Sequence, residues 1–304
     1  MKSWIQERAK ALGFDKVGVC SATLDGIHKT ALSAWVGRGY AGEMDYMVRD
    51  WQRRADPSLV LPGAKSLMAL ATNYYHPENP PPQDRGRLGR VARYAYGRDY
   101  HNVIGKGLKK LIAAIRERAP MARLKGYVDT GPVLERAVAA QAGLGFIGKN
   151  TTLITEDYGS WVFLSVILTD LELEPDQPLG LDCGNCTVCL KACPTGAIVE
   201  PTVIDSRRCI SYLTIEYRGD EIPAELARQS GDWVYGCDIC QEVCPYNRAT
   251  TPSRPEFHPS QGVGAWLPLD DLEKGAVSLA GTPLKRAGLK GLARNARAVA
   301  DHSP

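Results

Sequence analysis

Four cysteines near the middle of the chain impose the strongest constraint on its fold. They follow the spacing Cys-x2-Cys-x2-Cys-x3-Cys-Pro and are Cys183, Cys186, Cys189 and Cys193, with Pro194 after the last. This spacing is the bacterial-type ligand run for a [4Fe-4S] cluster, in which the fourth cysteine binds a different cluster. The run therefore predicts two clusters, and the fold must bring a second set of ligands close to it.

A second, partial run supplies the missing ligands. Its cysteines are Cys237, Cys240 and Cys244, followed by Pro245, and Cys209 lies between the two runs. Each cluster then takes a cysteine from the neighbourhood of the other. We assign one cluster to Cys183, Cys186, Cys189 and Cys244, and the other to Cys193, Cys209, Cys237 and Cys240.

Two alternatives would use the same cysteines. A structural zinc is usually held by two Cys-x2-4-Cys pairs separated by a longer loop, which fits three cysteines at two-residue spacing poorly. Disulfides would require an oxidising compartment. Nine cysteines, with eight assigned to metal, agree with a reducing cytoplasm, and we expect the ninth, Cys20, to be a buried core thiol. The N-terminus lacks the apolar stretch of a signal peptide, and no segment resembles a membrane span.

Apolar periodicity predicts a mixed α/β (α+β) fold around these cysteines. We expect helices over residues 1–12, 27–36, 44–54 and 101–118, and strands over 16–20, 66–73, 90–96, 124–129, 151–155 and 161–169. The expected organisation is an α/β domain over 1–170, a ferredoxin-like double-cluster domain over 171–250 and a short helical tail over 251–304.

The turn after the strand over 124–129 contains a candidate acid. Pro132 suits the first position of a helix, which makes Gly131 the expected cap and leaves the carboxylate of Asp129 free of that role. The residue pattern alone favours an ordinary turn aspartate at this position.

Charge is distributed unevenly along a chain whose net charge is only +3. Residues 84–125 hold twelve Lys or Arg against three acids, and residues 285–297 add five more with no acid. This asymmetry suggests that one face binds a polyanion, with phosphates the obvious candidates. The alternative is a solvated helix face, and charge alone favours neither.

Over nearly its whole length the chain resembles the epoxyqueuosine reductases. The resemblance rests on the cysteine runs and on R-x-D-P-x-L-V-L-P-G-A-K-S from Arg54, R-Y-A-Y-G-R-D-Y-H from Arg93, V-D-T-G-P-V-L-E-R-A from Val128, G-L-G-F-I-G-K-N from Gly143, and R-R-C-I-S-Y-L-T from Arg207. It implies a cobalamin- and iron–sulfur-dependent oxidoreductase that reduces epoxyqueuosine at the tRNA wobble position to queuosine, the last step of queuosine biosynthesis.

The resemblance also implies roles for individual residues. Asp129 matches the family's proton donor, and a general acid must be protonated near neutral pH, which burial against a corrin face would achieve by raising its pKa. His101 misses the cobalt-ligand signature Asp-x-His-x-x-Gly by one residue, and the family binds cobalamin without a histidine ligand, so it is not assigned to cobalt. The positions that match the cobalamin pocket or lie beside it are Arg54, Asp129, Leu153, Leu164, Ser211 and Asp238.

The partners implied are tRNA carrying epoxyqueuosine and an external low-potential electron donor, with no membrane, for a cytoplasmic monomer. Many relatives continue into a helical-repeat tail, whereas this sequence ends about one repeat helix after the cluster module, so the basic segment is expected to make tRNA contacts instead. Two other hypotheses stay open: a reductive dehalogenase-like corrinoid enzyme, and a non-catalytic iron–sulfur electron carrier. Bound corrinoid would exclude the carrier.

Overall fold

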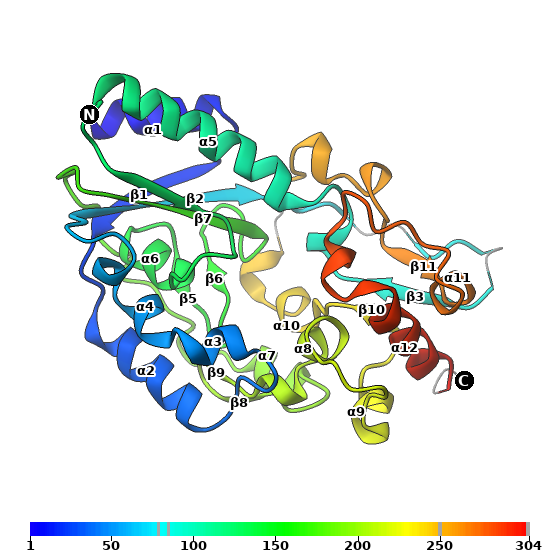
Figure 1. Cartoon of the computed structure of the whole chain (residues 1–304). Helices are drawn as coiled ribbons and strands as arrows, with labels where there is room; N and C mark the ends of the chain where they lie inside the picture. Colours follow the sequence, from blue (N-terminus) through cyan, green and yellow to red (C-terminus); the bar gives the residue numbers. More distant parts are fainter. Residues whose placement is uncertain (78–79, 84–85, 249–250, 302–304) are drawn as a thin grey trace.

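The N-terminal part of the chain is built on a four-stranded antiparallel sheet. The computed structural model describes residues 1–77, 80–83, 86–248 and 251–301. The strand order is β1-β2-β7-β4, formed by Lys16–Ser21, Ser66–Asn73, Val162–Thr169 and Leu124–Tyr127. Helices α1 (Lys2–Ala11) and α5 (Tyr100–Arg118) cover one face, and α6 (Glu135–Gln141) covers the other (Figure 1).

Both faces of the sheet are covered, so its central strands are apolar without interruption. Every residue of β2 is buried. Because successive side chains of a strand point to opposite faces, Met68 and Leu70 pack toward the α1 and α5 side, whereas Leu67 and Ala69 pack toward α6. This sandwich fixes β4 and α6, the two elements that flank the Asp129 turn.

A second sheet joins distant parts of the sequence. Strand β3 (Leu88–Val91) pairs in parallel with β10 (Trp233–Tyr235) and antiparallel with β11 (Trp266–Pro268). Val91 therefore shares a core with the residues of α11 (Leu269–Glu273) and α12 (Gly288–Ala300). The domain boundary near residue 170 remains a prediction, and the segment around β3 packs with residues from beyond it.

Short elements make up the rest of the described chain. The cysteines lie at or next to α7 (Val188–Ala192), α8 (Ile210–Ile215) and α10 (Ile239–Glu242). The other elements are α2 (Gly26–Gly37), α3 (Asp45–Arg49), α4 (Trp51–Ala55), α9 (Ala224–Gln229), β5 (Phe146–Ile147), β6 (Leu153–Ile154), β8 (Ile198–Glu200) and β9 (Val203–Ile204), with several single 3-10 turns.

Helix α12 is attached to the cluster module by two buried polar side chains. The guanidinium of Arg294 donates to the carbonyl oxygens of Leu213, Tyr217 and Gly219, at 2.8 to 3.0 Å. The amide of Asn295 donates to the carbonyls of Thr214 and Val234. The expected short helical tail thus packs firmly on α8 and β10.

The structure confirms the mixed α/β class and corrects three local predictions. The helix expected over 44–54 is interrupted at Asp50, which separates α3 from α4. The strand expected over 90–96 ends at Val91 and continues as a 3-10 turn, Arg93–Ala95. The helix expected from Pro132 begins at Glu135, with Leu134 as its N-cap. In the part of the chain that the structure covers, no helix is long and apolar enough to cross a membrane.

Packing explains the late start of α6. A Cβ atom on Gly131 would lie 2.3 Å from the ring of Tyr127, so the chain passes directly over that ring. The carbonyl oxygen of Gly131 also accepts a hydrogen bond from Arg54. Both contacts hold Gly131 in the turn. The φ of Pro132, although favourable for a first helical residue, therefore does not start the helix there.

Candidate metal centres and active site

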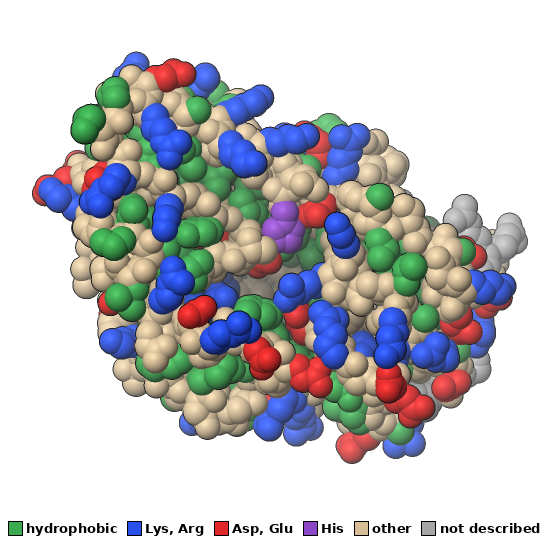
Figure 2. Space-filling model, viewed as in Figure 1, with side chains coloured by type: hydrophobic (Ala, Val, Ile, Leu, Met, Phe, Trp, Pro, Cys, Tyr) green, Lys and Arg blue, Asp and Glu red, His purple; other side chains and the backbone are tan. Residues whose placement is uncertain are grey.

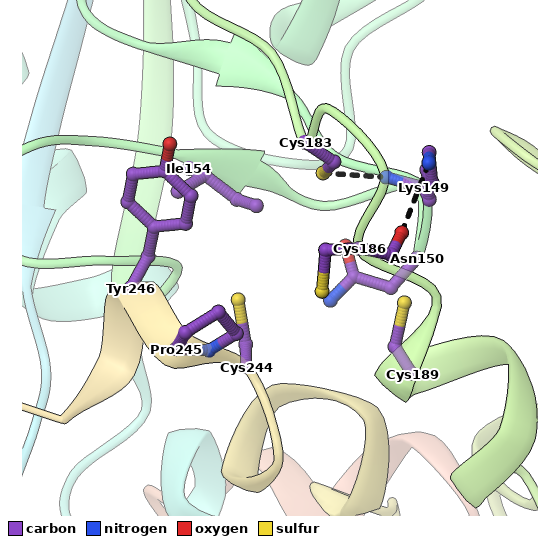
Figure 3. A pocket seen from close by; sticks show the side chains of 9 residues that line it. All are labelled: Lys149, Asn150, Ile154, Cys183, Cys186, Cys189, Cys244, Pro245 and Tyr246. Atoms are coloured by element: carbon purple, nitrogen blue, oxygen red, sulfur yellow. Dashed lines mark hydrogen bonds between the residues drawn. The ribbon is translucent and has the colours of Figure 1, made fainter.

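Four cysteines from both runs line one cavity. They are Cys183, Cys186, Cys189 and Cys244, and their thiols are arranged around the same space (Figure 3). Lys149, Asn150, Ile154, Pro245 and Tyr246 complete its wall. The structure therefore brings Cys244 to the cysteines of the first run, across more than fifty residues of sequence.

The spacing of these thiols bears on the zinc alternative. No three His, Cys, Asp or Glu side chains among residues 1–77, 80–83, 86–248 and 251–301 are grouped so that they could hold one metal ion. A single zinc would draw its sulfurs to about 2.3 Å from one point, whereas a four-iron cube binds them at its separate corners. The Cys-x2-Cys-x2-Cys-x3-Cys-Pro spacing therefore remains the reason to prefer a cluster to zinc.

The other four assigned cysteines also come together. Cys240 is close enough to Cys209 and Cys193 for their charges to interact, and Cys237 to Cys209. Burial raises the pKa of the Cys237 and Cys240 thiols well above its ordinary value. Thiolates at these buried positions would need a metal to stabilise them.

Backbone and side-chain donors are directed at the cysteine ligands. The N–H of Lys149 donates to Sγ of Cys183 at 3.4 Å, and the N–H of Ala197 donates to Sγ of Cys193 at 3.3 Å. The ammonium of Lys149 bonds the carbonyls of Gly184 and Cys186, which closes the first loop. Hydrogen bonds to cluster sulfurs are among the factors that set a cluster's reduction potential.

The ninth cysteine, Cys20, is 1% exposed, and burial raises its pKa to about 12, which confirms it as an inert core thiol.

Asp129 lies in the turn between β4 and α6, in a left-handed backbone conformation. Its φ is 59°, which a residue other than glycine adopts rarely and which aspartate tolerates better than most. Its side chain is 59% exposed, and Oδ2 lies 3.3 Å from Nε2 of His101. Tyr100 lies near enough to this carboxylate to lower its pKa. The acid therefore faces open space with its oxygens held by α5.

Without a corrin, the pKa of Asp129 lies below its ordinary value. Desolvation by the surrounding groups acts to raise it, but interactions with His101 and Tyr100 outweigh desolvation. The expectation that burial against a corrin face raises this pKa stays a prediction, and the histidine opposite the carboxyl is a feature that the sequence did not reveal.

His101 carries the proton instead. Desolvation acts to lower its pKa, yet hydrogen bonds to Asp129 and Asp99 and the charges of both acids raise it to about 9. Its Nδ1 lies 2.8 Å from Oδ1 of Asp99, which also caps α5. Both ring nitrogens thus lie within hydrogen-bonding distance of carboxylates, and the absence of a bond from His101 to cobalt stays a prediction.

Sequence reasoning missed Glu135, the first residue of α6. Its Oε1 accepts the backbone N–H of Asp129 at 2.9 Å. Desolvation and the charge of Asp129 raise the pKa of Glu135 to about 8. The signal that could have found it is its place six residues after Asp129, at a helix start, where an acid is favoured.

The remaining predicted residues lie in different environments. Arg54 bonds the carbonyls of Tyr46 and Gly131 and so touches the Asp129 turn. Leu153 is 3% exposed, Leu164 is half-buried beside it in the same core, and Ser211 is half-buried on α8. Asp238 is 1% exposed; its carboxylate accepts the backbone N–H of Arg93 at 2.7 Å, and burial raises its pKa to about 6.

One face of the molecule is hollowed in its middle. Figure 2 shows Lys and Arg side chains along α5 and around the rim of this hollow. Lys106, Lys109 and Lys110 are exposed on α5, as an anion-binding face requires. In the basic tail, however, Arg294 is buried in the α12 network and Arg286 pairs with Glu216 at 2.8 Å. The basic residues of α5 therefore contribute exposed positive charge, whereas these two arginines of the tail, one buried and the other paired with an acid, add little to it.

Two family models match separate parts of the chain. The model described as "Epoxyqueuosine reductase QueG, DUF1730" matches residues 54–130, which include Arg54, His101 and Asp129. The model described as "4Fe-4S double cluster binding domain" matches residues 182–247, which include all eight assigned cysteines.

Curated proteins and solved structures are similar over most of the chain. An epoxyqueuosine reductase of Gloeobacter violaceus is 46% identical over 97% of this chain and 94% of its own length, and one of Vibrio cholerae is 43% identical over 85% and 70%. A crystal structure of an epoxyqueuosine reductase with an epoxyqueuosine-modified tRNA-Tyr stem loop has a TM-score of 0.90 at 36% identity, covering 99% of this chain and 81% of that one. A Bacillus subtilis structure, with its catalytic aspartate loop swung out of the active site, has a TM-score of 0.90 at 35% identity and the same coverage.

Proposed function

Because this chain belongs to the epoxyqueuosine reductase family, we infer that it is an iron–sulfur oxidoreductase that acts on tRNA and reduces epoxyqueuosine to queuosine. The observation that carries this function is the presence in one fold of two grouped sets of cysteines and an acid, Asp129, that faces open space beside a protonated histidine. An electron carrier would need the cysteines alone.

The reaction balances with two electrons and two protons. The epoxide loses its oxygen as water, both carbon–oxygen bonds break, and a carbon–carbon double bond forms. The electrons come from an external low-potential donor through the two clusters. Protons must reach the departing oxygen, and the protein must supply them where bulk water is displaced by the tRNA.

We propose that cobalamin binds on the open side of Asp129. When bound, cobalamin supplies the low-valent cobalt that reacts with the epoxide. The residues proposed to hold it are Arg54, Asp129, Leu153, Leu164 and Ser211, with Asp238 fixing the cluster loop behind them. Two observations support the fit: both nitrogens of His101 are engaged by carboxylates, as suits a corrin bound without a histidine ligand, and Leu164 contributes apolar surface that is not fully buried.

The proton source we propose is the pair formed by Asp129 and His101. At neutral pH the imidazolium of His101 holds the proton and the carboxylate of Asp129 accepts its hydrogen bond. As negative charge develops on the epoxide oxygen, the proton of His101 moves to the Asp129 carboxylate and from there to that oxygen, which leaves His101 neutral. A substrate that displaces water would also raise the pKa of Asp129 and favour its protonation.

The basic surface along α5 is the proposed contact for tRNA phosphates. Lys106, Lys109 and Lys110 project from one helix that also carries His101 near its first turn. A tRNA anticodon stem lying on this helix would bring its loop toward Asp129. A tRNA substrate and reduced thiols both agree with work in the cytoplasm.

One assay tests the function directly. Anaerobically reconstituted protein, reduced with a low-potential donor, is incubated with an epoxyqueuosine-modified tRNA stem loop, with and without added cobalamin. We expect queuosine, identified by mass, only when the reductant and cobalamin are both present. Reduced protein that binds no corrinoid and forms no queuosine would contradict the proposal and return the chain to the class of electron carriers.

A further inference from the structure

The turn that carries Asp129 is a strained segment between two rigid elements. It leaves β4 at Tyr127 and enters α6 at Glu135, and Asp129 is one of three described residues other than glycine with a positive φ. Such a conformation is unfavourable for a residue other than glycine and persists only where neighbouring groups hold it. The similar epoxyqueuosine reductase of Bacillus subtilis has been solved with its own catalytic aspartate loop swung out of the active site.

The backbone of the turn is held from outside by two side chains. The carboxylate of Glu135 accepts the N–H of Asp129 at 2.9 Å, and the guanidinium of Arg54 donates to the carbonyl of Gly131 at 3.1 Å. The bond from His101 reaches only the Asp129 carboxylate, which can rotate without moving the backbone. Contacts to the backbone are therefore the ones that decide where the turn lies.

Glu135 is well placed to hold the turn because its own helix is fixed. The next residues of α6, from Ala137 to Ala139, are 0 to 4% exposed and pack on β2 and β7. The acceptor oxygen of Glu135 thus belongs to the rigid sheet layer, while the N–H that it binds belongs to the turn. This hydrogen bond, from the N–H of Asp129 to Oε1 of Glu135, therefore holds the turn against the rigid layer, and we call it the latch.

We propose that Glu135 is a positioning residue, which keeps Asp129 turned into the active site by accepting its backbone N–H. It does not touch substrate and donates no proton to it. Loss of the bond leaves the strained conformation without its main support, and the turn moves outward with Asp129. The effect on turnover rests on the proposed function, whereas the latch itself is a property of the fold.

The experiment measures the latch and the reaction separately. Amide hydrogen exchange is followed at Asp129 in the cluster-loaded protein and in Glu135→Ala, Glu135→Asp and Glu135→Gln. We expect exchange to rise roughly tenfold or more in the Ala and Asp variants, which lose or withdraw one hydrogen bond. The Gln variant keeps an acceptor oxygen, so its exchange stays near that of the unmutated protein. Glu135→Asp keeps the carboxyl group on a shorter side chain and serves if Glu135→Ala does not fold.

Single-turnover rates of the same variants provide the functional readout. The rate should fall in Glu135→Ala and Glu135→Asp and recover in Glu135→Gln, with unchanged binding of the tRNA stem loop. Glu156→Gln, which changes an exposed acid on another loop, is the control for both measurements.

Unchanged exchange at Asp129 in Glu135→Ala, or equal exchange in the Ala and Gln variants, would overturn the latch. Fast exchange with normal turnover would overturn its positioning role. Absence of turnover in the unmutated protein would count against the function alone, since exchange still decides the latch.

Discussion

Nε2 of His101 lies 3.3 Å from Oδ2 of Asp129, while Nδ1 of the same ring lies 2.8 Å from Oδ1 of Asp99. The histidine therefore bridges the start of α5 and the turn after β4. Both acids favour the imidazolium form, so a positive charge lies between two carboxylates at neutral pH. In the mechanism proposed above, the supply of protons therefore depends on three residues, of which only Asp129 contacts the substrate.

Replacing Asp129 by asparagine should abolish most of the turnover. Asn keeps the shape and one acceptor oxygen but cannot pass on a proton. General acid catalysis is typically worth ~10²- to 10⁴-fold, and we expect a loss on that scale in the epoxide-opening step. The measurement is a single turnover with pre-reduced enzyme, so that slow electron delivery does not hide the chemistry. Asp157→Asn, which affects only an exposed pair with Lys16, is the matched control. A normal rate in Asp129→Asn would show that the proton comes from elsewhere.

The His101 bridge should make stability depend on pH. Its pKa is raised from the ordinary value of 6.5 to about 9 in the folded protein. A raised pKa means that the folded state binds the proton more tightly, so this contribution is complete below pH 6.5 and is lost as the pH rises through 9. We expect the Tm difference between the unmutated protein and His101→Gln to be largest near pH 6 and to shrink by pH 9.5. A gap that is constant or grows with pH would contradict the bridge.

Exchange of ligands between the cysteine runs can be tested by single substitutions. Cys244→Ala should damage the cluster bound by Cys183, Cys186 and Cys189, whereas Cys193→Ala should damage the other. Each variant should retain roughly four of the roughly eight irons that two [4Fe-4S] clusters require, and their paramagnetic resonance spectra should differ. Roughly four irons in the unmutated protein would contradict the two-cluster assignment. Two variants with the same residual spectrum would contradict the exchange of ligands.

Binding of tRNA should weaken steeply with salt if α5 contacts phosphates. Each such contact contributes about 0.7 to 0.9 to the slope of log affinity against log salt, because counterions are released. Charge reversal at Lys106, Lys109 and Lys110 should therefore reduce the slope by about two to three if all three touch phosphates. Reversal of three exposed lysines elsewhere, Lys10, Lys29 and Lys274, is the control. An unchanged slope would make α5 an ordinary solvated face.

Arg294 should contribute to stability and not to tRNA binding. It is 5% exposed, and its removal leaves the carbonyls of Leu213, Tyr217 and Gly219 without these donors. Hydrogen bonds to charged groups are worth about 1.5 to 3 kcal/mol each, so Arg294→Ala should lower the free energy of unfolding by at least about 2 kcal/mol. Arg297→Ala, an exposed position on the same helix, should change it little. Denaturant unfolding decides, and equal values for the two variants would contradict the network.

Short-range sequence patterns, namely cysteine spacing and apolar periodicity, predicted much of the fold and part of the candidate site. Cysteine spacing, which the cluster itself dictates, predicted that Cys244 lies with the first run, and the four cysteines concerned do line one cavity; their ligation of clusters stays a prediction. Apolar periodicity found α1, α5, β2 and β7 nearly to the residue, because each buries a continuous face.

Contacts between distant segments account for what was missed. His101 and Asp129 are 28 residues apart in the sequence. They are close in space because α5 packs on the sheet that contains β4. Gly131 was taken for a helix cap because nothing in the sequence shows that Tyr127 lies beneath it. The sequence analysis included Arg294 among the basic residues of the tail. A count of charged residues along the sequence cannot distinguish those on the buried side of a helix from those on its exposed side.

The pairing of β3 with β10 and β11 has a consequence for synthesis. A ribosome releases β3 long before its two partners, so this strand must wait with unpaired edges while the cysteines between emerge. The sheet closes only when residue 268 is free of the exit tunnel, by which time every cysteine of the two runs has already left the ribosome.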